Sequence, residues 1–109
     1  MRALLLSVML LVLVPSLAAA GEVYGTIKEG GKPVKDGLKV ALACGAKTVE
    51  GDTDKFGGYR LFAPQEGKCT LTLRVGEETP SVTLQSFEDS ARYNLLLERK
   101  DGKYILRTE

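Results

Sequence analysis

The chain contains no histidine and no tryptophan, and only two of its 109 residues are cysteine. Without histidine there is no imidazole base, which excludes Ser-His-Asp triads and histidine-ligated zinc sites. If the two cysteines pair with each other, a thiol nucleophile is missing as well. Most familiar catalytic machinery is therefore excluded. We expect a protein that is not an enzyme and that uses no cofactor.

The charge balance gives no basic surface for a polyanion. Lysine and arginine together number 15, against 14 aspartates and glutamates. Arg2 belongs to the N-terminal segment, so the rest of the chain is formally neutral. A neutral domain with interspersed charges lacks the electrostatic footprint of a nucleic-acid binder. We expect no nucleic acid among its partners.

The N-terminus has the features of a secretory signal peptide. Met1-Arg2 is a short positive start, residues 3–14 are almost entirely apolar, and Ala18–Ala20 supplies small residues for a peptidase. A membrane anchor is the alternative, but spanning a bilayer takes roughly 20 apolar residues. We expect residues 1–20 to be cleaved, leaving no membrane span, and residues 21–109 to form one small periplasmic or secreted domain.

Two short strands carry the only cysteines. Residues 38–44 and 69–75 alternate in polarity, so Cys44 and Cys69 each lie on the apolar face of their strand. Disulfides persist outside the cytosol, and closing this loop would stabilise the domain by about 3–4 kcal/mol. The alternative is a pair of separate buried thiols. We expect the disulfide, at the edge of the core.

The rest of the chain is also typical of β-structure. Asp101-Gly102 between two lysines is a two-residue hairpin signal, and no helical period appears after the N-terminal segment. Further strands are expected at 22–28, 47–53, 59–63, 81–85, 92–98 and 104–106. Strands at this spacing predict an all-β fold, an antiparallel β-sandwich of seven to eight strands.

An ordered series of residues resembles the carboxypeptidase regulatory-like domain, a transthyretin-like (prealbumin-type) β-sandwich. The series reads Gly21-x-Val23-x-Gly25-x-Ile27, Lys32-Pro33-Val34, Gly37-x-x-Val40-x-Leu42, Thr53-Asp54 with Gly57, Tyr59-x-Leu61, Pro64 and Gly67-x-x-x-Leu71. It covers roughly residues 21–75, and the bulky Phe56 departs from it. The resemblance implies a seven-stranded sandwich.

The same resemblance implies a stabilising, adhesive or contact-making module rather than a catalyst. Transthyretin-like folds include hydroxyisourate hydrolase, which relies on histidines and a characteristic C-terminal tetrapeptide. This chain has no histidine and ends Leu106-Arg107-Thr108-Glu109, so that enzyme is excluded. We expect a non-catalytic binding or structural module whose partner is a protein or a cell-envelope component, met at exposed strand edges or at the turn around Phe56.

Three alternating carboxylates form a second candidate site. Glu50, Asp52 and Asp54 would share one face of a strand and could serve a calcium ion or a carboxylate-based metal-dependent enzyme. Charged side chains also protect edge strands from pairing, and an aspartate before a turn bonds backbone N–H groups two residues on. We favour these structural roles and assign no metal.

Outward aromatic side chains form the remaining candidate surface. Tyr24, Phe56 and Phe62 are expected outside the core, where they could contact a ligand or stack on a sugar. A glycan-binding module is therefore the alternative function. It would gain support if Tyr24 and Phe62 lie outward on neighbouring strands.

Overall fold

The computed structural model describes residues 20–109, and this part of the chain forms ten β-strands and no helix. The strands are β1 (Glu22–Glu29), β2 (Lys32–Pro33), β3 (Lys39–Cys44), β4 (Lys47–Asp52), β5 (Gly58–Phe62), β6 (Gly67–Leu73), β7 (Ser81–Ser86), β8 (Ala91–Arg92), β9 (Leu95–Lys100) and β10 (Lys103–Thr108). The count exceeds the expected seven to eight because β2 and β8 are only two residues long. The predicted signal peptide lies outside the described residues, apart from Ala20.

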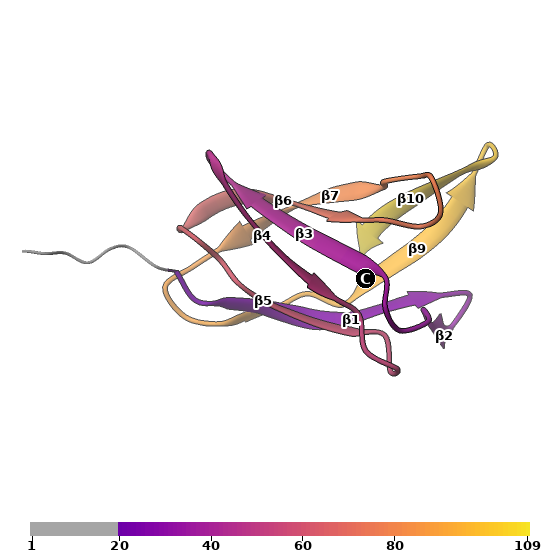
Figure 1. The fold of residues 1–109 in the computed structure, drawn as a ribbon, viewed down its shortest axis with the longest axis horizontal. Coiled ribbons are helices and arrows are strands. Elements are labelled where there is room, and N and C mark those ends of the chain that lie inside the picture. The colour runs from indigo at the N-terminus through magenta and orange to yellow at the C-terminus, as the bar shows by residue number, and fades with distance from the viewer. Residues whose placement is uncertain (1–19) are drawn as a thin grey trace, which may run out of the picture.

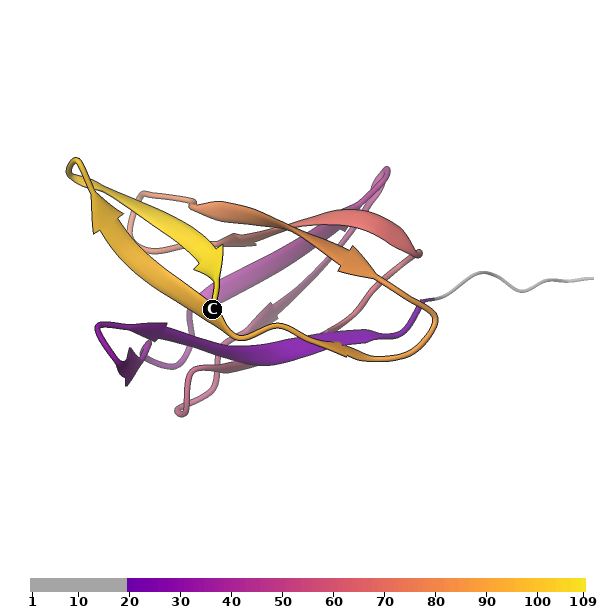
Figure 2. The same cartoon turned by 180° about the vertical axis from the view of Figure 1, so that it is seen from behind.

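The strands form two sheets that face each other as a sandwich (Figures 1 and 2). One sheet has the order β10-β9-β1-β2, with β5 and β8 also paired to β1; the other has the order β4-β3-β6-β7. The all-β sandwich prediction is confirmed.

One feature of the topology differs from the antiparallel prediction, because β1 runs parallel to both β8 and β9. The cause is the crossover after β7. The Gly21 N–H donates to the Phe87 carbonyl over 2.7 Å, so the chain leaves the second sheet beside the start of β1. It therefore enters β8 and β9 in the direction of β1. The remaining ladders are antiparallel.

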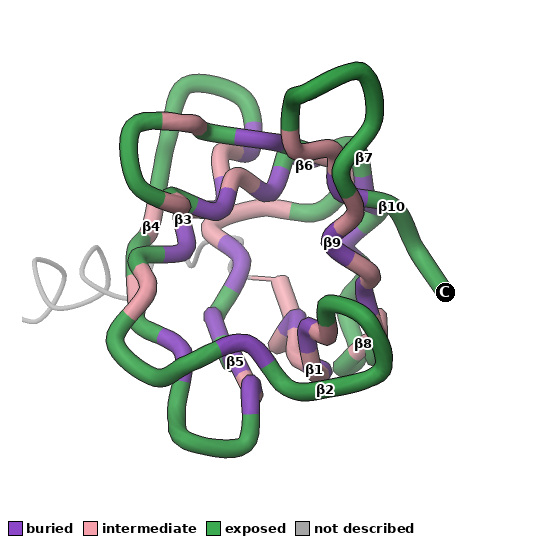
Figure 3. The backbone as a smooth tube through the Cα atoms, turned by 90° about the vertical axis from the view of Figure 1, so that its right-hand side faces the viewer, coloured by how far each residue is buried: buried purple, intermediate pink, exposed green. Residues whose placement is uncertain are grey.

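The core lies between the two sheets and follows the predicted alternation. In β1 every second residue is buried, and β3 and β6 show the same period (Figure 3). The most deeply buried aliphatic side chains, each at most 1% exposed, are Val23, Ile27, Val40, Leu42, Leu71, Leu73, Leu95 and Leu97. Apolar burial of this kind is the main driving force for folding.

A disulfide joins Cys44 and Cys69, as predicted. The two residues are direct partners in the β3–β6 ladder, with 4.3 Å between their Cα atoms. Both side chains are almost completely buried, so the bridge lies inside the core rather than at its edge. It connects the two central strands of the four-stranded sheet.

The final hairpin has the predicted turn. Asp101 and Gly102 have φ angles of 54° and 80°, the positive values that a type I′ turn requires at both central positions. Lys100 and Lys103 pair across it. Within residues 20–109, no helix has the length and apolar character needed to cross a membrane.

Candidate functional site

A row of three side chains crosses the outer surface of the first sheet. Tyr24 on β1 is the register partner of Arg60 on β5 and of Arg92 on β8. Its neighbours Val23 and Gly25 are buried, so the Tyr24 side chain points outward. The guanidinium carbons of Arg60 and Arg92 lie 5.7 and 5.8 Å from the Tyr24 ring centroid. Each cation–π contact at an exposed site is worth about 0.5–1 kcal/mol.

The two arginines differ in their remaining partners. The Arg60 Nε lies 3.1 Å from Glu22 Oε2, and only 16% of the Glu22 side chain is exposed. Among residues 20–109, no carboxylate lies within ion-pair distance of Arg92. Arg60 is therefore held in place by Glu22, whereas the charge of Arg92 is available to a ligand.

Phe62 extends this surface. It is the register partner of Glu22 on β1, so it is a diagonal neighbour of Tyr24 on the same face. Its side chain is 69% exposed. We call the surface formed by Glu22, Tyr24, Arg60, Phe62 and Arg92 the Tyr24 face. On one face of the sheet it places an open aromatic ring and a guanidinium group without an ion-pair partner among residues 20–109.

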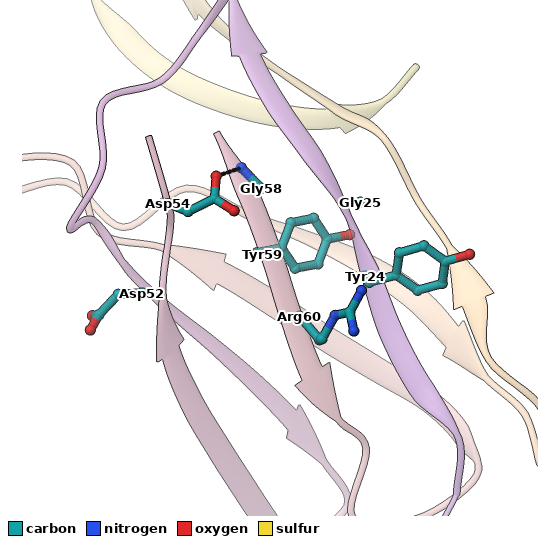
Figure 4. Close-up of a pocket in the computed structure, with 7 residues that line it drawn as sticks. All are labelled: Tyr24, Gly25, Asp52, Asp54, Gly58, Tyr59 and Arg60. Carbon is teal, nitrogen blue, oxygen red and sulfur yellow. Dashed lines mark hydrogen bonds between the residues drawn. The ribbon is translucent and has the colours of Figure 1, made fainter. Parts of the chain in front are cut away.

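A shallow hollow of about 400 Å³ adjoins the Tyr24 face (Figure 4). It is lined by Tyr24, Gly25, Asp52, Asp54, Gly58, Tyr59 and Arg60. In Figure 4 the Arg60 guanidinium lies beside Tyr24, the Asp54 carboxylate turns toward Gly58, and Asp52 points away from both. The acidic and basic groups of the hollow therefore do not converge on one point.

Asp54 is occupied by its own turn, as the sequence indicated. Its Oδ1 accepts hydrogen bonds from the backbone N–H groups of Phe56 and Gly58, both at 2.8 Å. These bonds hold the pKa of the Asp54 carboxyl below its usual value, and the bond from Gly58 has the larger effect. The carboxylate thus stabilises the turn that leads into β5.

The three carboxylates do not form the shared face that strand alternation predicted. β4 ends at Asp52, so Asp54 lies in the turn and not on the strand. Asp52 Oδ1 lies 3.5 Å from Lys39 Nζ, and Glu50 borders a different hollow, beside Thr72 and Arg74. Within residues 20–109, no group of three or more acidic or cysteine side chains is placed to hold a metal ion. The calcium alternative loses its geometric basis.

Partly buried hydrogen bonds fix the segment after β8 against β1 and β5, beneath the Tyr24 face. The Tyr59 hydroxyl donates to the Tyr93 carbonyl over 2.7 Å, and the Tyr93 N–H donates to the Tyr24 carbonyl over 2.8 Å. Gly25 permits this approach, because a Cβ there would collide with the Tyr93 carbonyl. Burial, and to a lesser degree Tyr93, raises the pKa of Tyr59 well above its ordinary value. The position of Arg92 depends on this packing.

Two edge strands have backbone groups capped by side chains. The Tyr93 hydroxyl donates to the Gln85 carbonyl at 2.7 Å and accepts from the Gln85 N–H at 3.3 Å, at β7. At β10, Glu78 Oε1 accepts from the Tyr104 N–H at 2.7 Å. Capped edges resist pairing with another strand. The sequence predicted contact with a partner either at exposed strand edges or at the turn around Phe56. Addition of a partner strand is obstructed at these positions of β7 and β10.

The three predicted ligand-surface aromatics divide into two places. Tyr24 and Phe62 lie together on the Tyr24 face. Phe56 is 67% exposed in the turn before β5, with the Lys55 Nζ 5.3 Å from its ring centroid. Phe56 and Phe62 thus lie at opposite ends of β5.

Sequence reasoning missed both arginines of the row. Alternation along β5 places Arg60 outward, which was the available signal. For Arg92 no comparable signal existed, because its position beside Tyr24 depends on the parallel register between β1 and the two-residue β8.

Comparison with known proteins supports the architecture. No protein-family model matches the chain, and no curated protein does so either. Among solved structures, the chain is similar to a DUF3823 family protein from Parabacteroides merdae ATCC 43184, with a TM-score of 0.56 and 16% sequence identity. The match covers 74% of this chain and 46% of that protein, so the chain spans about half its length. This likeness shows the fold alone, and the carboxypeptidase regulatory-like assignment stays a prediction.

Proposed function

We propose that residues 21–109 form a non-catalytic binding module that acts after export, in the periplasm or outside the cell. Its partner is a protein or another component of the cell envelope, which it contacts through the Tyr24 face. The observation that carries the proposal is the combination of Phe62, 69% exposed, with the unpaired Arg92 on one sheet surface. Aromatic and arginine side chains are enriched where binding energy is concentrated.

The geometry of the face favours recognition of a rigid surface. The outer side chains of β5, β1 and β8 are spaced by strand pairing, and Arg60 is further fixed by Glu22. A side chain that is ordered before binding loses less conformational entropy when a partner arrives. Phe62 supplies apolar surface and Arg92 supplies N–H donors, and the energetic centre of a protein interface commonly combines the two.

The absence of catalysis is part of the proposal. Support comes from the lack of histidine in the sequence, from the pairing of both cysteines in the disulfide, and from the position of Asp54 in a turn outside the strand that carries Glu50 and Asp52. Asp54, whose carboxyl pKa is lowered, has one oxygen engaged by two backbone N–H groups. Its pKa shift therefore has a structural cause.

The test uses immobilised residues 21–109 and the detergent-solubilised envelope of the source organism. Phe62→Ser and Arg92→Ala should each reduce the amount of the main retained component, measured by quantitative mass spectrometry. Phe56→Ser is the matched control, because it removes a phenylalanine of nearly equal exposure, 67%, from a different site. Equal retention by all three variants would reject the Tyr24 face as the contact surface.

Glycan binding is the second candidate function, because Tyr24 and Phe62 do point outward from neighbouring strands. Phe62 offers the open ring, since both arginines pack against Tyr24. Affinity electrophoresis in gels containing neutral or acidic polysaccharides is the assay. Retardation of the wild-type domain that disappears in Phe62→Ala and Tyr24→Ala would establish this function; unretarded wild-type protein in every polysaccharide would exclude it.

A further inference from the structure

A second hollow, separate from the Tyr24 face, is lined by residues of β2, β9 and β10 and of the segment before β3. Figures 1 and 2 show that these elements lie at the same end of the sandwich. The hollow encloses about 450 Å³. We call it the Tyr104 groove; it is lined by Glu29, Lys32, Pro33, Val34, Lys35, Leu38, Val75, Gly76, Leu97 and Tyr104. Its lining comes from β1, β2, β9 and β10 of the first sheet and from the segments that lead into β3 and out of β6 of the second. Small-molecule sites are clefts of about 300–1,000 Å³.

The floor of the groove is apolar. Val34 and Leu97 belong to the core and are 6% and 1% exposed. Leu38 and Val75 pack against the same core and remain partly open. An apolar ligand that covers the open parts of Leu38 and Val75 lowers the free energy by about 25 cal/mol per Å² of apolar surface removed from water.

Tyr104 forms a wall that is fixed before any ligand binds. The Arg99 guanidinium carbon lies 4.4 Å from the centroid of the Tyr104 ring. The Tyr104 N–H donates to Glu78 Oε1 over 2.7 Å, and Glu78 Oε2 lies 4.0 Å from Arg99 Nη1. The Tyr104 ring is thus held in place by Arg99, and this wall of the groove exists before a ligand binds.

The rim carries more positive than negative charge. Lys32 and Lys35 are both exposed at the groove, and Glu29 is the single acidic residue that lines it. In the part of the chain that the structure describes, neither lysine forms an ion pair. The rim therefore has an unbalanced positive charge beside an apolar floor. The complementary ligand has one anionic group attached to an apolar body.

We propose that the Tyr104 groove binds a medium-chain fatty acid. The hydrocarbon chain lies on Leu38 and Val75, above the buried Val34 and Leu97 and against the Tyr104 ring, and the carboxylate meets Lys32 and Lys35 at the rim. This inference goes beyond the proposed function, since it concerns another surface and does not need the Tyr24 face. It assigns to the domain a small-molecule site in addition to its contact with a partner.

The test titrates sodium decanoate, kept below its micelle concentration, into isotopically labelled residues 21–109 and follows amide shifts by NMR. We expect saturable shifts at Val34, Leu38, Val75, Leu97 and Tyr104. Exposed lysine–carboxylate contacts are modest, so Lys32→Gln with Lys35→Gln should weaken decanoate about tenfold. The matched control, Lys47→Gln with Lys68→Gln, removes two exposed lysines that do not line the groove and should change nothing.

Neutral decanol separates the two parts of the proposal. Its affinity should be the same for wild type and for the Lys32→Gln, Lys35→Gln double variant, because only the carboxylate uses the lysines. Amide shifts that do not saturate, or that are confined to strands outside the groove, would overturn the proposal. So would equal decanoate affinity in the Lys32→Gln, Lys35→Gln variant and the Lys47→Gln, Lys68→Gln variant. Concentration-dependent shifts of the groove residues without decanoate would also overturn it, since a second copy would then cover the groove.

Discussion

Removing the disulfide should destabilise the domain by more than any single surface change. Cys44 and Cys69 are separated by 25 positions in the sequence. In the chain-entropy treatment, opening a loop of that length costs about 3.5 kcal/mol. A domain of this size has a total free energy of unfolding of about 5–13 kcal/mol. The melting temperature should therefore fall by roughly 15–25 °C.

The assay is a double-mutant cycle measured by urea unfolding. Cys44→Ala and Cys69→Ala each break the same bond, so the two single variants should lose nearly equal stability. The double variant should lose little more than either one, which is strong non-additivity. Cys44→Ser and Cys69→Ser should likewise match each other, with a further cost for a buried hydroxyl.

Reduction of the wild-type protein is the independent check. Both cysteine side chains are at most 1% exposed, so the reductant reaches the bond mainly when the chain opens. After reduction in partly denaturing urea, the wild type should melt at the temperature of the double variant. Additive losses in the cycle, or a double variant within about 1 kcal/mol of wild type, would refute the reasoning.

Three further variants, Gly25→Ala, Tyr59→Phe and Asp54→Asn, test the packing beneath the Tyr24 face and the turn beside it. Gly25→Ala should cost about 2 kcal/mol or more in urea unfolding, because the added methyl group collides with the Tyr93 carbonyl; unchanged stability would show that β8 moves freely. Tyr59→Phe should cost about 2 kcal/mol by leaving that carbonyl without its hydroxyl donor. Because the pKa of Tyr59 is raised in the native state, its contribution to the free energy of unfolding is complete below pH 10.0, the ordinary tyrosine value, and should decline as pH rises above it. A free energy of unfolding that falls no more steeply with pH in wild type than in Tyr59→Phe would contradict this. Because the pKa of Asp54 is lowered in the native state, its carboxylate stabilises the fold above pH 3.8, the ordinary value, and this contribution is lost as pH falls through the native pKa. In Asp54→Asn the melting temperature should therefore fall less steeply with acidification than in wild type. The same acid dependence in both proteins would contradict this.

Much of the fold was accessible from local patterns. Alternation placed Val23 and Ile27 in the core, and the phase of two strands brought both cysteines inward. The Asp101-Gly102 hairpin followed from the positive φ that its two residues tolerate. Each of these properties depends on neighbours within a few positions, which a single sequence contains.

The remaining features depend on contacts between distant segments. The parallel ladders of β1 with β8 and β9 result from a crossover between sheets, and nothing in residues 91–100 specifies strand direction. The same holds for the site. Tyr24 was recognised as outward, but its contact with Arg92 joins residues 68 positions apart. For Asp54, alternation was extended two residues beyond the end of β4, where the turn had already begun.

The most direct test of the functional account is an NMR footprint of the bound partner. The purified envelope component is added to labelled residues 21–109, and the loss of each amide signal is followed. We predict that signals of Tyr24, Arg60, Phe62 and Arg92 broaden first while that of Phe56 stays sharp. Broadening centred on the Phe56 turn or on the edge of β4, with the Tyr24 face unaffected, would contradict the account.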